Sequence, residues 1–357
     1  MLPYFSLYGL LSLLGLRDYG QRTVPILIAS SIFLIWFAGL RFYVGCDYHS
    51  YYIRYRETAL FDWQTVFASQ ESGFGALTYV FAKAGASFSL FQAFVTACMV
   101  FLYAKFIVRH QHAMYLLALL FPILILQLGM SGMRQALAVG FVMLAYNAFI
   151  DKRRLLVGVW VFVAFSFHSS AMIILPMAFL AGRDISLPRL IAGFVLLAPL
   201  AALLLGDRAE VYFDRYIDEI YGDQSSSGAW IRYLFVALPA ILFANYRAEI
   251  KAKYPDVYQL LLLGALFIAA LVLTGLISSI ALHRLTFYAF PLSILMTLYV
   301  SLAAARDPRN GFVFWLAAYG VYICVWFLFS FHAAQCYIPY QNVTFSDVVV
   351  PAWALNL

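Results

Sequence analysis

The sequence predicts an all-α integral membrane protein that crosses the bilayer about twelve times, counting short and broken helices. Of its 357 residues, 64% are hydrophobic and only 11% are charged, and the mean hydropathy is +0.86. A soluble domain usually carries about 25% charged residues, so a water-soluble fold would expose too much apolar surface. The apolar runs at 190–205, 260–280 and 312–331 are long and do not alternate. Helices are therefore favoured over the alternating strands of a barrel.

The expected spans follow from these runs, because a helical crossing needs about 20 apolar residues. The chain is expected to form one transmembrane domain over residues 1–357. The first sixteen residues lack a basic start and a small-residue cleavage site, so they predict a retained span rather than a signal peptide. Candidate spans begin near Leu2, Val24, Phe88, Ala113, Gly132, Leu155, Ser169, Pro188, Trp230, Val257, Leu285 and Gly311.

The basic connections predict which side each end faces. Lysine and arginine gather at Arg17/Arg22, Lys105/Arg109, 152–154, Arg183/Arg189, 247–253 and Arg306/Arg309. About twelve crossings place all of them on one side, which is cytoplasmic by the positive-inside rule. This requires 155–181 to form two short legs that meet near His168 on the outer side. One long helix there would reverse the orientation of every later span, and the excess of basic residues on the cytoplasmic side would disappear.

Two segments are expected to be outer, periplasmic loops. Residues 41–87 begin with a charged, tyrosine-rich stretch and end with an apolar run too short to cross, which predicts an interfacial or re-entrant helix. Residues 206–229 are polar and acidic, and a loop of this kind can cover a site.

Composition also restricts the class of function. The net charge is +6, but no basic run is long enough to indicate a nucleic-acid partner, and basic residues in a membrane protein reflect topology and anionic lipid. The four cysteines show no metal spacing, although Cys46 and Cys336 could pair in an oxidising compartment. Phosphate-binding glycine loops, paired histidines and hydrolase elbows are missing from the sequence. An enzyme of this kind would use positioning and electrostatics, without a metal or another cofactor.

Arginines at the outer ends of spans predict an anionic ligand at the outer interface. Arg134 and Gln135 are expected in the first turn of a helix, where free N–H groups and the helix dipole favour phosphate. Arg284 begins another span and shares a helical face with Tyr288. Arg41 opens the first outer loop. Headgroup anchoring explains any one of these arginines equally well.

Candidate groups for acid–base work and sugar contact lie in the same outer segments. Asp47 and Tyr51 share a helical face, and an aromatic ring can stack on a sugar while a carboxylate takes a proton. Glu71, at the end of the charged stretch, is a second carboxylate. His168 breaks an apolar stretch. The alternatives are an interfacial tyrosine belt and a histidine that only packs.

Five short elements, in this order, resemble the EpsG family of polysaccharide polymerases, which includes Wzy-type O-antigen polymerases. They are residues 39–51, 71–74, 133–135 and 167–170, and the pair Arg284/Tyr288. The ending Ile338-Pro339-Tyr340 is also similar to the family's C-terminal pattern, whereas 183–243 carries no matching motif.

The resemblance implies a GT-C-like membrane glycosyltransferase on the periplasmic face of a bacterial inner membrane. Its substrates would be undecaprenyl diphosphate-linked oligosaccharides as donor and acceptor, and its partners a flippase and a chain-length regulator. On this reading Arg41, Arg134 and Arg284 bind the diphosphate, and Tyr51, Gln135 and Tyr288 bind glycan. The general base is then Asp47, Glu71 or His168. A ligase for the same donor and a lipid-linked saccharide transporter are the alternatives.

Overall fold

The computed structural model describes residues 1–17, 20–193, 195–196, 228–304, 307–345 and 350. These residues form helices throughout, with one isolated bridge between Arg41 and Asn342. Most of the predicted outer loop 206–229 lies outside the described residues.

Six helices in the described part of the chain are long and apolar enough to cross a membrane, and they make this a membrane protein. A bent pair, α13 (Ala229–Asn245) with α14 (Arg247–Lys253), makes a seventh candidate, with a 76° bend. The six are Gly20–Gly39, Phe88–Ile107, Met133–Ile150, Pro255–Ile277, Ser279–Ala304 and Pro308–Phe329. Four shorter apolar helices accompany them, so the all-helical prediction is confirmed, whereas the expected twelve crossings stay a prediction.

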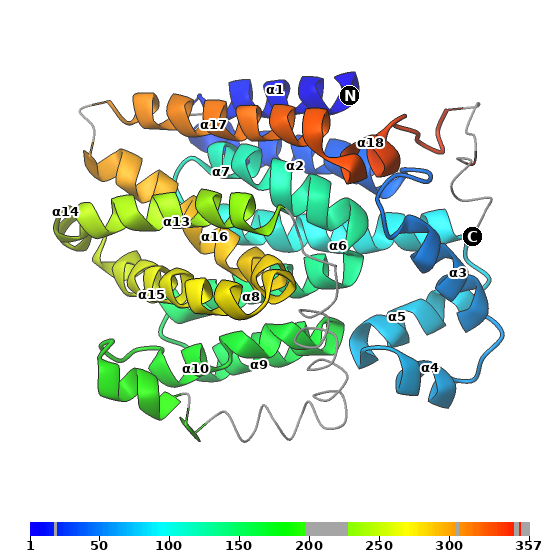
Figure 1. The fold of residues 1–357 in the computed structure, drawn as a ribbon, viewed down its shortest axis with the longest axis horizontal. Helices are drawn as coiled ribbons and strands as arrows, with labels where there is room; N and C mark the ends of the chain where they lie inside the picture. Colours follow the sequence, from blue (N-terminus) through cyan, green and yellow to red (C-terminus); the bar gives the residue numbers. More distant parts are fainter. Residues whose placement is uncertain (18–19, 194, 197–227, 305–306, 346–349, 351–357) are drawn as a thin grey trace. The chain divides into compact units, whose positions relative to one another are not determined.

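The chain divides into two compact units, and the first contains both ends of the described chain. It comprises residues 1–140, 166–168 and 313–357. In it α1 packs on α7, and η2 packs on α6 (Figure 1). Its elements are α1 (Leu2–Gly15), α2 (Thr23–Leu34), the π-helix η2 (Ile35–Gly39), α3 (Tyr48–Thr58), α4 (Trp63–Ser69), α5 (Ser72–Lys83), α6 (Phe88–Ile107), α7 (Ala113–Leu120), the π-helix η3 (Phe121–Gly129), the start of α8 (Met133–Ile150), the end of α17 (Pro308–Phe329) and α18 (Phe331–Tyr337).

The second unit comprises 141–165 and 169–312 and is built around α16 (Ser279–Ala304). Helices α13 and α15 (Pro255–Ile277) pack against α16 and against each other. Gly264 of α15 lies at a close approach to α16, where an added Cβ would lie 3.1 Å from the Cβ of Leu292. Small residues at such contacts are typical of helices that associate within a bilayer.

The stretch after α8 turns back on itself at His168, as the charge pattern predicts. Helix α9 (Arg154–Phe167) ends there, and the chain continues as η4 (Ser169–Ile174) and α10 (Pro176–Leu180) (Figure 1). Nε of Arg154, at the start of the first leg, donates to the carbonyl of Ala181 just after the second leg, at 2.6 Å. The two ends of the hairpin therefore meet.

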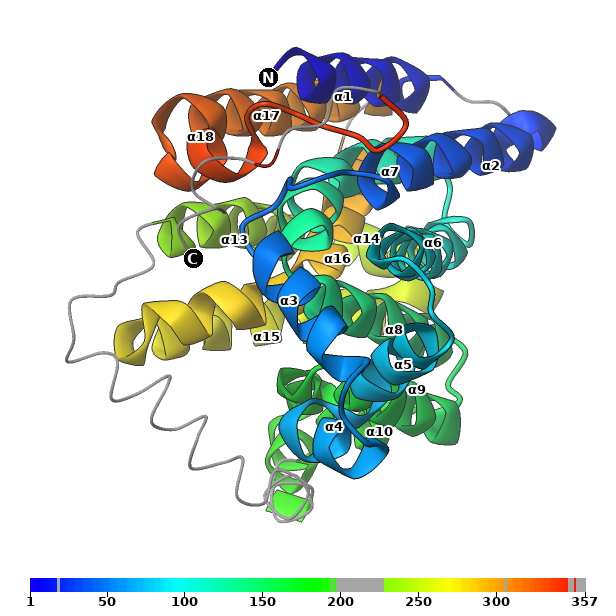
Figure 2. The same cartoon turned by 90° about the vertical axis from the view of Figure 1, so that its right-hand side faces the viewer.

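Three short helices occupy the segment that was expected to be an outer loop. Helices α3, α4 and α5 have 11, 7 and 12 residues, and α5 contacts both of the others (Figure 2). The carboxylate of Asp62 accepts the Thr65 N–H at 2.8 Å and so caps α4. None of the three is long enough to cross a bilayer alone.

Candidate functional site

An ion pair between Glu71 and Arg134 marks the site in the first unit. Nη1 of Arg134 donates to Oε2 of Glu71, and the side chains are 28% and 8% exposed respectively. Glu71 is the N-cap residue of α5, and Arg134 is the second residue of α8. Two helix starts therefore present opposite charges to each other, although 63 residues separate them.

Tyr51 of α3 is the second neighbour of Arg134. Its hydroxyl accepts the backbone N–H of Arg134 at 3.4 Å, and the guanidinium carbon lies 6.0 Å from the centre of its ring. The phenol therefore accepts a hydrogen bond from one of the N–H groups at the start of α8 that have no partner within the helix. Burial raises the pKa of Tyr51, so this phenol stays protonated at neutral pH.

His168 approaches the same pair. The backbone of Gly73, two residues after Glu71, lies so close to Ser166 that an added Cβ would overlap the serine hydroxyl. His168 is buried and interacts electrostatically with the Glu71 carboxyl. Burial raises the pKa of Glu71, but the guanidinium of Arg134, together with the interaction with His168, outweighs burial, and the pKa lies below its ordinary value. Glu71 is thus a carboxylate at neutral pH.

The guanidinium of Arg134 can still donate a hydrogen bond to a ligand. Its Nε is buried and has no hydrogen-bond acceptor among the residues that the structure describes. A buried donor of this kind is costly unless a ligand or water satisfies it. Because arginine presents several N–H groups in a planar fork, it can hold Glu71 and still offer donors to an oxyanion.

Arg41 is placed differently from Arg134. It is fully buried, and its Nε and Nη1 donate to the carbonyls of Val44 at 2.9 Å and Ala38 at 2.5 Å. The amide of Gln92 donates to the carbonyls of Gly39 and Arg41 from the other side. Burial lowers the pKa of Arg41 to about 10, which leaves it charged at neutral pH. Its contacts shape the loop between η2 and α3.

The remaining predicted residues of the first unit are Asp47 and Gln135. Asp47 is exposed and is the N-cap residue of α3, and its charge contributes to raising the pKa of Tyr51. Gln135 follows Arg134 and is buried. The structure therefore gathers Asp47, Tyr51, Glu71, Arg134, Gln135 and His168 in one unit.

Arg284 and Tyr288 belong to the second unit. Arg284 is exposed on α16, whereas Tyr288, one turn later, is buried. The Tyr288 hydroxyl lies 3.0 Å from that of Ser170, and its carbonyl accepts the Tyr146 hydroxyl at 2.8 Å. Tyr288 thus ties α16 to η4 and α8 within that unit.

A family model matches residues 25–342, which include every candidate residue above. The chain belongs to the EpsG family. Membership of this family suggests a role of the polysaccharide polymerase type. Neither a curated protein nor a solved structure matches the chain.

In this EpsG-family chain, Ser131 and Tyr337 make contacts that no motif of the sequence predicts. The Ser131 hydroxyl lies 2.7 Å from that of Tyr337 and accepts the Cys46 N–H at 3.0 Å. The Tyr337 hydroxyl also reaches the carbonyls of Leu126 and Gln127, at 3.3 and 3.1 Å. The available signals were the serine two residues before the Met-Arg-Gln motif and the tyrosine directly before Ile338-Pro339-Tyr340.

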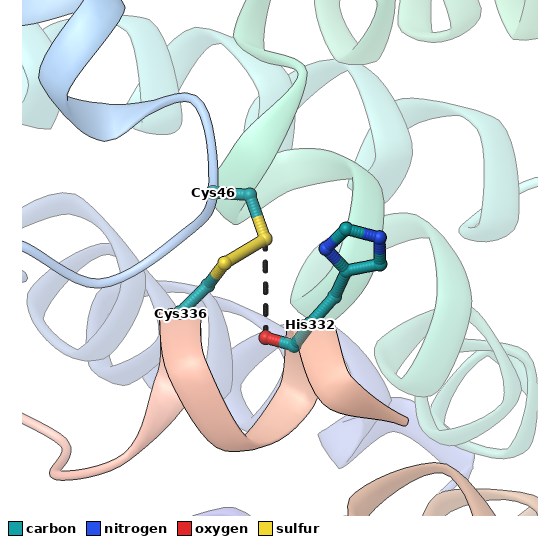
Figure 3. A group of neighbouring side chains, drawn as sticks. All are labelled: Cys46, His332 and Cys336. Atoms are coloured by element: carbon teal, nitrogen blue, oxygen red, sulfur yellow. Dashed lines mark hydrogen bonds between the residues drawn. A yellow bond between two sulfur atoms is a disulfide. The ribbon is translucent and has the colours of Figure 1, made fainter. Parts of the chain in front are cut away.

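One group among the described residues has donor atoms close enough for a metal ion. It consists of Cys46, His332 and Cys336, whose donor atoms lie within 4.8 Å of one another (Figure 3). The two sulfur atoms are bonded to each other, however, as the sequence analysis allowed. A metal would need both as free thiolates.

Proposed function

We propose that the chain polymerises oligosaccharide repeat units linked to a lipid diphosphate, of the undecaprenyl type, on the periplasmic face of a bacterial inner membrane. A growing glycan would leave its lipid diphosphate and join a sugar hydroxyl of a fresh lipid-linked unit. The observation that carries the proposal is the Arg134 site, a partly exposed arginine held by a carboxylate at a helix start, in a chain of the EpsG family.

The chemistry of the leaving group explains why Arg134 is the central residue. As the glycosidic bond breaks, negative charge grows on the diphosphate oxygen that leaves. A fixed guanidinium at a helix N-terminus stabilises that charge without reorganising. Glu71 holds the guanidinium in one orientation, so the Arg134 side chain has already lost its conformational entropy before the substrate binds. We therefore assign Glu71 to orienting Arg134.

Proton removal from the acceptor hydroxyl then falls to Asp47 or His168. Glu71 is a poor candidate for the base, because Arg134 lowers its pKa and holds its oxygen. Asp47 is exposed at the start of α3 and has room for an acceptor sugar. His168 is buried beside the pair and would need the acceptor to reach it.

We assign the other predicted residues to secondary roles within this proposal. Arg284 belongs to the second unit, where it is exposed on an apolar helix, and its predicted role as a diphosphate ligand stays a prediction. Arg41 shapes the loop before Asp47, because its Nε and Nη1 donate to backbone carbonyls, while its buried Nη2 has no acceptor among the described residues. Tyr51, Gln135 and Tyr288 are buried, so their contact with glycan would require the substrate to enter between helices.

The deciding experiment supplies purified protein in nanodiscs with its lipid-linked repeat unit as the only substrate. A ladder of longer glycans, formed without nucleotide sugar, supports the polymerase. Transfer that begins only when an acceptor other than the lipid-linked repeat unit is added would instead indicate a ligase. Movement of the lipid-linked unit across the bilayer without new bonds would indicate a transporter.

The general base is assigned by variants in the same assay. Asp47→Asn and His168→Gln each keep a similar shape but lose a basic group. The variant of the true base should lose about 100- to 10,000-fold in rate. Equal, small losses in both would contradict this assignment.

A further inference from the structure

A covalent bond near the Arg134 site joins two segments of the first unit that are far apart in the sequence. Cys46 precedes Asp47, whereas Cys336 lies in α18, and 290 residues separate the two cysteines (Figure 3). Their Cα atoms are 4.9 Å apart, and the neighbouring Gly45 N–H donates to the Cys336 carbonyl at 2.8 Å. The loop before α3 is thus fixed to α18 by a disulfide and by its backbone.

The same place also touches the segment that leads into Arg134. Gly45 lies against Met130 so closely that an added Cβ would overlap the Met130 carbonyl oxygen. The Cys46 N–H donates to the Ser131 hydroxyl, which in turn contacts the Tyr337 hydroxyl. Three segments therefore meet within a few residues of the start of α8.

Hydrogen bonds connect this junction of three segments to the Arg134 site. Helix α3 begins two residues after Cys46, and one turn along it the Tyr51 hydroxyl accepts the Arg134 N–H. Helix α8 begins two residues after Ser131. The junction thus sets the positions of both helix starts between which Arg134 lies.

We propose that the Cys46–Cys336 disulfide is a positioning element of the Arg134 site, which holds the starts of α3 and α8 in register for binding of the lipid diphosphate. This rests on the proposed function. Forming the bond removes two protons and two electrons from the two thiols, and a disulfide donor takes them up and becomes a dithiol. His332, whose carbonyl oxygen lies 3.9 Å from the Cys46 sulfur, stands beside the pair.

The first measurement tests the bond itself by alkylating the unfolded protein without and with reductant. The expected counts of reactive thiols are two and four, because Cys98 and Cys324 are free. Four reactive thiols without reductant would overturn the proposal. Protection that disappears when a chelator alone is added would also overturn it, since that outcome means a metal held by Cys46, His332 and Cys336.

The second measurement tests positioning by hydrogen exchange, which does not depend on any enzyme activity. In the Cys46→Ser/Cys336→Ser variant we expect exchange about tenfold faster in peptides 47–55 and 131–137. Peptides of α15 should not change, and the Cys98→Ser/Cys324→Ser variant is the matched control. Equal acceleration in α15 would mean a general structural role and would overturn positioning, as would no acceleration at all.

The third measurement links the bond to the reaction. Reducing the wild-type protein should slow ladder formation roughly 10- to 100-fold, and reoxidation of the same sample should restore it. The Cys98→Ser/Cys324→Ser variant should keep its rate. A reduced protein that polymerises at the full rate overturns the proposal. If the oxidised wild type makes no ladder while exchange still responds to the bond, the polymerase assignment fails and positioning of Arg134 stands.

Discussion

Within the second unit, helices α13, α15 and α16 meet through apolar and small residues, whereas around Arg134 in the first unit the contacts are polar and join distant segments. Gly264 and Leu292 represent the first kind of contact. The Glu71–Arg134 pair represents the second. Lipid is as apolar as leucine, so helices associate through close packing, and small residues suffice for it. Ionised groups are costly to bury, and their retention in a membrane protein indicates function.

Among the contacts that distinguish the two units, the largest expected effect comes from Arg134. Arg134→Ala should lower the rate of ladder formation about 100- to 1,000-fold, because a donor aimed at the leaving oxygen is lost. Arg134→Lys should recover only part of this loss, since an ammonium lacks the planar fork. Arg189→Ala, which removes an exposed arginine beside Asp184, is the matched control and should keep the wild-type rate. Normal polymerisation by Arg134→Ala at wild-type protein levels would refute the assignment.

Substituting one glycine in each unit tests how tightly the two units are packed. Gly45→Ala should destabilise the fold by about 2–5 kcal/mol, because φ is +103° there and the new Cβ meets the Met130 carbonyl. Gly264→Ala should change stability by about 1 kcal/mol or less, since improved helix propensity offsets a contact of 3.1 Å. Thermal unfolding in detergent measures both. Equal losses of stability in the two variants would contradict the difference in packing between the two units.

Glu71→Gln should reduce the rate about tenfold, because a neutral amide orients Arg134 less firmly than a carboxylate. The pH dependence has a definite sign. The folded pKa of Glu71 lies below its unfolded value, so the ion pair stabilises fully above the ordinary glutamate pKa of about 4.3 and is lost as pH falls through the folded pKa.

The stability difference between wild type and Glu71→Gln should therefore stay constant from neutral pH down to about 5 and shrink below about 4. Melting temperatures across that range measure it. A difference that grows toward acid pH would mean that Glu71 is protonated in the folded protein.

The smallest effect is expected in the second unit. Ser293→Ala removes a hydroxyl that donates to the Phe235 carbonyl at 3.2 Å. Interhelical hydrogen bonds in membranes contribute about 0.6 kcal/mol on average, so the melting temperature should fall only slightly and the ladder should be unchanged. A marked loss of polymerisation would contradict the view that this hydrogen bond only stabilises the packing of α13 on α16.

Much of the site could be anticipated because its residues break the apolar pattern. Arg134, Glu71 and His168 stand out as charged or titratable groups beside apolar runs, and the charge bias predicted the turn at His168. Ser131 and Tyr337 could not be singled out, because serine and tyrosine are ordinary residues at helix ends. The sequence placed the cation Arg41 at the end of a span, but only the fold revealed that two of its nitrogens donate to backbone carbonyls.

By itself, the sequence determined the helical membrane class and the motifs of the EpsG family, because hydropathy and short spacings are local properties of the chain. Only the tertiary structure decided that Glu71 pairs with Arg134 and that Cys46 bonds to Cys336. These partners are 63 and 290 residues apart, and their encounter depends on how whole helices pack. Sequence periodicity carries no record of that packing, since one apolar face can meet many others.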